Sequence, residues 1–202
     1  KGRHIQLARR SIAVASAFGL AGILSAIVLG DESGYDASEN QKMKMAAIEA
    51  MWETEPAPAS FTLFGFPDQA THETKWAIHI PYVMGLIGTR SLTQEILGID
   101  QLVARARDRV RNGITAYDLM MQIQAQRAAG VDPALLAQFR QYEQDLGYAL
   151  LLKARVEDPR SATEAQIEQA ANDTVPHVWP IFWGFRIMVG MGFGLVGVMA
   201  YF

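Results

Sequence analysis

The stretch WPIFWGFRIMVGMGFGLVGVMAYF, residues 179–202, decides the fold, because it is apolar except for one arginine. A helix needs about 20 such residues to cross the hydrocarbon core of a membrane. A second run, SIAVASAFGLAGILSAIVLG at residues 11–30, contains no charged side chain. The chain is therefore expected to be an all-α membrane protein, with two transmembrane helices flanking a mostly helical extracytoplasmic loop domain.

The expected organisation has four parts. They are a cytoplasmic flank, a transmembrane helix, a periplasmic loop and a second transmembrane helix, at residues 1–10, 11–30, 31–178 and 179–202. The orientation follows from charge, because Lys and Arg gather on the cytoplasmic side of membrane proteins. Between residues 31 and 185 there are 13 basic and 21 acidic residues, a net charge of −8. This charge excludes nucleic acid as a partner of the loop.

The first apolar run has the order of a secretory signal, with basic residues before an apolar segment. It is longer than the roughly 7–15 apolar residues usual in a signal, and the chain begins with Lys1 instead of methionine. We therefore expect an internal piece of a larger membrane protein. The sequence has no cysteine, so no disulfide stabilises the loop.

Local patterns predict several elements in the loop. A capping box from Ser38 to Gln41 predicts a helix over residues 38–52, which Pro56 and Pro58 follow. FTLFGF and KWAIHIP are expected to be extended. Helical periodicity over residues 100–129 predicts a long amphipathic helix.

Two further helices are expected after that long helix. One begins at Asp132 with Pro133 in its first turn, and the other is capped by Thr163. The arginines of RARDRVR, residues 105–111, form either a basic patch or a solvated helix surface. They occupy every second position and spread around a helix, which favours the solvated surface.

Arg186 and Met188 are the unusual residues of the last apolar run. A charge inside a spanning helix costs about 2.5–3.5 kcal/mol and requires a partner. Arg186 either extends to the outer interface or offsets the propionates of a haem whose iron Met188 ligates. Met188 otherwise fills an irregular apolar gap. Residues two apart diverge by roughly 200° on a helix, so Arg186 must curl round to reach a group bound at Met188.

The sequence shows no other familiar chemical motif. Its four histidines are scattered, with no zinc-binding spacing, and no phosphate-binding loop or serine nucleophile elbow is present; the histidines are His4, His72, His79 and His177. Any axial histidine of a haem therefore has to come from outside this sequence.

The polar segment after the first run contains a second group of candidates. Lys44 and Glu49 are five residues apart and diverge by about 140° on a helix. They either grip opposite ends of a flat ligand or belong to a solvated helix. Asp31 and Tyr35 lie just before them, and a carboxylate there can accept protons.

Several blocks together resemble subunit I of the cytochrome bd quinol oxidases. They are VLGDESGYD, QKMKMAAIEAMWETEPAPASFTLFGFPD, DLGYALLLKAR, ATEAQIEQA and FRIMV. The resemblance covers essentially the whole chain and is most specific over residues 28–68. It corresponds to two transmembrane helices and the periplasmic quinol loop between them, in the long-loop form of the family.

The resemblance implies roles for individual residues. By motif match, Lys44 and Glu49 correspond to the lysine and glutamate implicated in quinol binding and oxidation. Met188 corresponds to the methionine ligand of the low-spin b haem, and Arg186 to the arginine that stabilises its reduced state. Asp31 and Tyr35 belong to the quinol region.

The resemblance also implies a quinol:oxygen oxidoreductase of the bacterial inner membrane. Its members oxidise membrane quinol at the outer face and pass electrons to the low-spin haem for reduction of oxygen to water. The high-spin b haem and haem d are expected in the complete subunit, but this chain lacks their ligands, so alone it is expected to be inactive. The expected partners are the rest of subunit I, subunit II, small accessory subunits, lipid and quinol.

A competing hypothesis is a membrane receptor with two spanning helices and an extracytoplasmic helical sensor domain. It explains the topology equally well. It does not explain an arginine beside a methionine in the second span, nor the aromatic and proline-rich WETEPAPASFTLFGF, residues 52–66.

Overall fold

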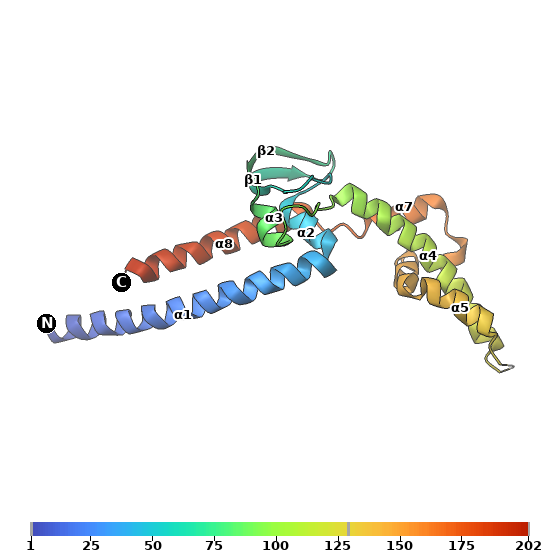
Figure 1. The fold of residues 1–202 in the computed structure, drawn as a ribbon, viewed down its shortest axis with the longest axis horizontal. Helices are drawn as coiled ribbons and strands as arrows, with labels where there is room; N and C mark the ends of the chain where they lie inside the picture. Colours follow the sequence, from blue (N-terminus) through green and yellow to red (C-terminus); the bar gives the residue numbers. More distant parts are fainter. Residues whose placement is uncertain (1, 129, 202) are drawn as a thin grey trace. The chain divides into compact units, whose positions relative to one another are not determined.

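The computed structural model describes residues 2–128 and 130–201, and the chain forms two compact units (Figure 1). The first unit runs to Leu97 and resumes at His177, and the second is Gly98–Pro176. Every candidate site residue predicted from the sequence belongs to the first unit. The structure is mainly helical, as expected, with one small sheet.

Two helices are long and apolar enough to cross a membrane. They are α1, Gly2–Asn40, and α8, Val178–Tyr201. Their side chains are mostly exposed, as expected of surfaces that meet lipid or other helices. Gly19 of α1 lies where any larger side chain would collide with the thioether of Met199 of α8, so the helices approach closely there.

Helix α1 continues past both predicted boundaries of the first transmembrane segment. The prediction of a helix that starts at Ser38 is wrong, because Ser38 lies inside α1 and its hydroxyl donates to the Tyr35 carbonyl at 2.7 Å. The new helix, α2, is Lys42–Glu49, and Gln41 before it makes no side-chain cap. No proline interrupts the chain before Pro56, so the helical backbone continues through the polar residues.

Helix α2 ends earlier than its sequence indicated. Ala50 adopts a left-handed conformation with φ of 50°, and its N–H donates to carbonyls of the last turn. This sharp end directs the chain into the hairpin of β1, Phe61–Asp68, and β2, Glu73–Ile80. The two extended segments predicted from the sequence thus pair with each other, antiparallel.

The hairpin packs on the start of α8 through aromatic rings. Phe64 and Phe66 lie 5.2 and 6.0 Å from the Trp183 ring, measured between centroids. A short helix, α3 (Val83–Gly88), follows the hairpin, and its Met84 is buried against Met51 and Ala59. Together these contacts fix β1 beside α8.

The second unit is a helical cluster around α4, Ile99–Gln126. The shorter helices are α5 (Pro133–Tyr142), α6 (Leu146–Leu152) and α7 (Glu164–Asn172), with single 3-10 turns η1 (Glu143–Asp145) and η2 (Pro159–Ser161). Buried apolar residues of α4, α6 and α7 form its core; they are Val110, Leu152, Ile167 and Ala170.

The predicted caps of this unit are confirmed. The Asp132 carboxylate accepts from the Ala134 N–H at 2.8 Å, and Thr163 forms a capping box with Gln166. The solvated surface predicted for the arginine run is confirmed, since Arg105, Arg109 and Arg111 are exposed, and three of its side chains also form ion pairs. Arg107, Arg109 and Arg111 pair with Glu168, Asp145 and Glu164 respectively, and so link α4 to the neighbouring helices.

Candidate functional site

Glu49 is the last residue of α2 and is almost completely buried, with 3% of its surface exposed. One of its carboxylate oxygens accepts from the Thr62 N–H of β1 at 3.3 Å and from the Arg186 guanidinium of α8 at 3.0 Å. Burial raises the pKa of Glu49 from 4.5 to about 7, against the charge of Arg186 and the hydrogen bond from Thr62, which lower it. Glu49 is therefore suited to gain and lose a proton near neutral pH.

Arg186 has five N–H groups, and all five find acceptors within the chain. They donate to the carbonyls of Thr62, Ile48 and Phe182 and to the Glu49 carboxylate. The guanidinium carbon also lies 3.5 Å from the centroid of the Phe182 ring. The partners expected for the Arg186 charge thus lie at the end of α2 and the start of the hairpin.

Lys44 lies on the same short helix as Glu49 but is solvent-exposed. The five-residue spacing carries the two side chains to different faces of α2, one outward and one into the core. The expectation that Glu49 is a solvated side chain is wrong, because β1 and α8 cover it. The role of Lys44 stays a prediction.

Asp31 and Tyr35 are brought together by Arg90, a residue that the sequence analysis missed. The Arg90 guanidinium donates to Asp31 at 2.8 Å and to Glu32 at 2.7 Å, and lies 4.5 Å from the Tyr35 ring centroid. All three partners belong to the C-terminal part of α1. A signal was available, since Arg90 is the only Lys or Arg between Lys75 and Arg105.

Met188 is 61% exposed on α8. Its thioether is thus accessible to a group from outside this chain, as is that of Met191, which is 66% exposed. His177 lies eleven residues away, about 16 Å along a continuous helix, so it is too distant to share that iron. Within residues 2–128 and 130–201 no cluster of three or more metal-binding side chains occurs. The role of Met188 as a haem ligand stays a prediction.

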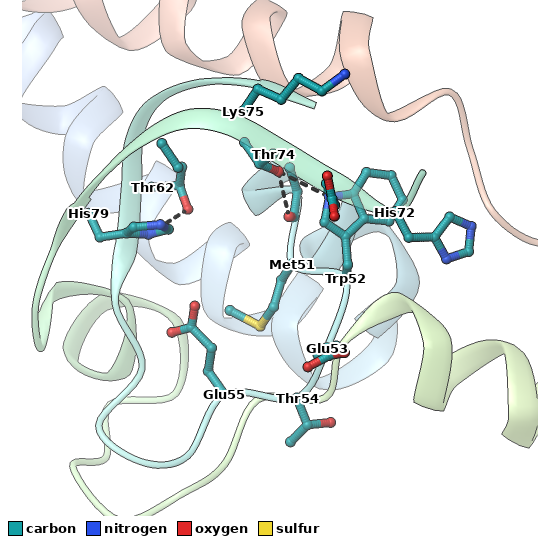
Figure 2. Close-up of a pocket in the computed structure, with 13 residues that line it drawn as sticks. Met51, Trp52, Glu53, Thr54, Glu55, Thr62, His72, Thr74, Lys75 and His79 are labelled. Carbon is teal, nitrogen blue, oxygen red and sulfur yellow. Dashed lines mark hydrogen bonds between the residues drawn. The ribbon is translucent and has the colours of Figure 1, made fainter. Parts of the chain in front are cut away.

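A pocket of about 470 Å³ lies between the chain after α2 and the hairpin (Figure 2). The Trp52 ring stacks on His72 with centroids 5.1 Å apart, and its N–H donates to the Thr74 hydroxyl at 3.0 Å. Thr62 and His79 line the same pocket. Thr62 therefore contacts Glu49 through its N–H and faces the pocket with its side chain.

A sequence model of the family described as cytochrome bd terminal oxidase subunit I matches residues 1–202. The chain is 40% identical over 200 residues to subunit 1 of the cytochrome bd-II ubiquinol oxidase of Escherichia coli (strain K12). The alignment covers 98% of this chain and 38% of that relative. Subunit 1 of the cytochrome bd ubiquinol oxidase of Bacillus subtilis (strain 168) is 27% identical over 104 residues, 52% of this chain and 22% of that relative.

The bd oxidase structure from Geobacillus thermodenitrificans is similar over 96% of this chain and 48% of that chain, with a TM-score of 0.42 and 16% identity. This chain thus spans well under half the length of the curated relatives that it matches.

Proposed function

The chain belongs to the cytochrome bd terminal oxidase subunit I family, and we propose that it forms the quinol-oxidising part of such an oxidase. The observation that carries this proposal is the buried pair of Glu49 and Arg186. It joins the end of α2 to the spanning helix two residues from Met188. Through Arg186, the proton acceptor Glu49 is therefore tied to the helix that carries the candidate haem ligand Met188.

Glu49 is the proposed base of the reaction. A quinol that gives up two electrons also releases two hydroxyl protons, and electron loss is easier as the protons leave. The pKa of about 7 lets Glu49 accept such a proton and release it again at neutral pH. The fixed charge of Arg186 stabilises the carboxylate that must form before each turnover.

Met188 is the proposed axial ligand of the low-spin b haem. Met188 would hold this haem, which would supply a one-electron acceptor for the quinol. The chain contributes the thioether and the short helical spacing from Met188 to Arg186. Because no N–H of Arg186 is spare, it acts on the haem through its charge and through Glu49, not through a direct hydrogen bond in this arrangement.

Lys44, Asp31 and Tyr35 are proposed to bind the quinol. Lys44 is exposed, so its ammonium group is accessible to a substrate oxygen. Asp31 and Tyr35 are held by Arg90 at the outer end of α1. On this proposal the loop lies on the periplasmic side, and the remaining haems, the site of oxygen reduction and the further subunits belong to parts outside this chain.

The test uses the complete oxidase with substitutions in α2. Glu49→Gln keeps the volume and an oxygen that can accept from Arg186, but it removes the titratable group. It should slow quinol oxidation strongly while an artificial donor that reduces the haems directly still supports oxygen consumption. Lys44→Ala should mainly raise the apparent Michaelis constant for quinol, because it removes a donor to bound substrate.

Matched controls come from neighbouring exposed residues. Lys42→Ala and Glu39→Gln alter the charge of the same region without touching the proposed site, and both should leave quinol oxidation unchanged. If Glu49→Gln and Lys44→Ala lose activity equally with quinol and with the artificial donor, the defect lies in assembly or downstream, and the proposal fails.

A further inference from the structure

We propose that His79, Ser60 and Glu55 form a proton outlet, which carries protons from the buried carboxyl of Glu49 to solvent through the pocket of Figure 2. This inference rests on the proposed function, because it concerns the proton that Glu49 takes from a quinol. It adds three residues to the site that neither the sequence patterns nor the family match assigns.

Thr62 has polar contacts on two sides. Its N–H donates to Glu49 on one side, and its hydroxyl lies 3.3 Å from Nδ1 of His79 on the other. Thr62 thus forms the wall between the buried carboxyl and the pocket. The charge of Glu55 acts on Glu49 across this wall, so the two carboxyls are close enough to interact.

A chain of polar contacts leads from Thr62 through His79 and Ser60 to Glu55. The same Nδ1 of His79 lies 3.4 Å from the Ser60 hydroxyl, which donates to the Glu55 carboxylate at 2.9 Å. The Ser60 N–H donates to that carboxylate oxygen as well, at 2.9 Å. Figure 2 shows Thr62, His79 and Glu55 around the same part of the pocket. These contacts link Thr62 to Glu55 without interruption.

Solvent exposure increases from Glu49 toward the far residues of this chain. Glu49 is 3% exposed, Glu55 is half-buried and His79 is exposed. The titratable and charged groups that line the pocket comprise three carboxyls against one lysine, with two histidines; they are Glu53, Glu55, His72, Glu73, Lys75 and His79. Arg186 faces Glu49 from the opposite side, on α8. A proton leaving Glu49 is therefore repelled by Arg186 and attracted by the acidic pocket.

The proton balance of the step is simple. A quinol hydroxyl gives its proton to the Glu49 carboxylate, which becomes a carboxylic acid. A water shared by the Glu49 carboxyl and the Thr62 hydroxyl passes this proton across Thr62, and a proton moves on to His79 or, through Ser60, to Glu55. Release to solvent restores every group.

The test measures oxygen consumption of the complete oxidase with quinol and, separately, with the artificial donor. His79→Ala should slow the quinol reaction by about tenfold or more, since positioned proton-transfer groups contribute factors of this order or larger. Added imidazole should restore the rate, and the rate with the artificial donor should stay at the wild-type value. His72→Ala, which changes the other histidine of the pocket, is the matched control and should leave the quinol rate unchanged.

His79→Gln separates proton transfer from hydrogen bonding, because the amide can hold Ser60 and Thr62 but does not titrate. It should be as slow as His79→Ala. A wild-type quinol rate in either variant, or a loss in His79→Ala that imidazole does not restore, overturns the outlet. If His79 proves dispensable while Glu49→Gln loses only the quinol reaction, the outlet alone fails and the proposed function stands.

Discussion

At the scale of single residues, the environment of Glu49 determines how the molecule responds to pH. Burial raises its pKa from 4.5 to about 7, so between these values the folded state keeps a proton that the unfolded chain has released. Stability contributed by this group therefore falls as the pH rises from about 4.5 to about 7. Only the carboxylate form of Glu49 can accept a quinol proton. The pH range in which this form appears is therefore the range in which Glu49 contributes less to stability.

A pH profile tests this assignment. The rate of quinol oxidation should rise with pH and reach half its plateau near pH 7, where Glu49 loses its proton. Arg186→Gln removes a positive charge that lowers the pKa of Glu49, so the midpoint should move to higher pH. Steady-state rates over pH 5–9 measure both, with haem spectra as the check of assembly. A midpoint that stays fixed in Arg186→Gln would contradict the coupling.

Met188 provides a second test at this scale. Met188→Leu keeps the volume and removes the sulfur, and because the side chain is exposed within this chain, its packing changes little. The low-spin haem spectrum and midpoint potential should change, while the oxygen-reducing haem stays in place. Optical redox titration of the complete oxidase is the measurement. Unchanged values would return Met188 to the role of apolar filler.

The sequence predicted these residues one by one but not their contacts. Glu49 and Arg186 are 137 positions apart, so no local pattern records that they pair. Arg186 also donates to the backbone carbonyls of Thr62 and Ile48, and Glu49 accepts from the backbone N–H of Thr62. These are backbone groups, so the residue types at those positions do not reveal the contacts. The burial of Glu49 was missed because nothing in the local sequence of α2 indicates it, and the hairpin and α8, which remove Glu49 from solvent, are distant in sequence.

At the scale of elements, local chemistry explains which predictions were right. Asp132 and Thr163 cap helices by accepting from residues two or three positions away. Such contacts can be predicted from the local sequence. The sequence around Ser38 has the same local pattern, but Ser38 lies inside α1, so no helix begins there. A continuing helix satisfies the backbone N–H groups that a cap would serve.

The close packing of α4 on η1 and α6 leads to a prediction about glycine. A Cβ at Gly113 would lie 2.6 Å from the Asp145 carbonyl oxygen and 2.7 Å from the Ala149 nitrogen, both backbone atoms. Gly113→Ala should destabilise the second unit by roughly 1–3 kcal/mol, the usual cost of overpacking. Denaturant titration followed by limited proteolysis of the loop in the complete oxidase measures this change.

Gly147→Ala is the matched control, because nothing lies within 4 Å of a Cβ at that position of α6. Alanine is the better helix former by about 1 kcal/mol, so this variant should be neutral or slightly stabilised. Equal effects at the two glycines would show that crowding at Gly113 does not limit stability.

At the scale of the whole molecule, the family match decides between the two functions that the topology left open. Two spanning helices around a helical domain fit a receptor and an oxidase equally, and the match to oxidase subunit I over the whole chain rejects the receptor. The overall class was predictable from the sequence, since two long apolar runs dominate it. The division into two units was not, because it depends on contacts between distant segments.

Orientation in the membrane is the prediction that belongs to this scale. The basic residues before the first apolar run predict that this end lies in the cytoplasm. Cysteines introduced by Glu39→Cys and Ala128→Cys, both at exposed positions, should react with an impermeant thiol reagent added outside spheroplasts. Gln6→Cys should react only after the membrane is opened. The opposite pattern of labelling would invert the whole topology.

The division into two units has a consequence for how this protein can vary. The second unit leaves the first after Leu97 and returns before His177, so it is a cassette inserted into the first unit. The acid, its arginine and the proposed proton outlet all lie outside the cassette. Closing a longer or shorter connection changes the free energy only slowly with its length. A change in the length of the cassette is therefore expected to leave the groups around Glu49 in place.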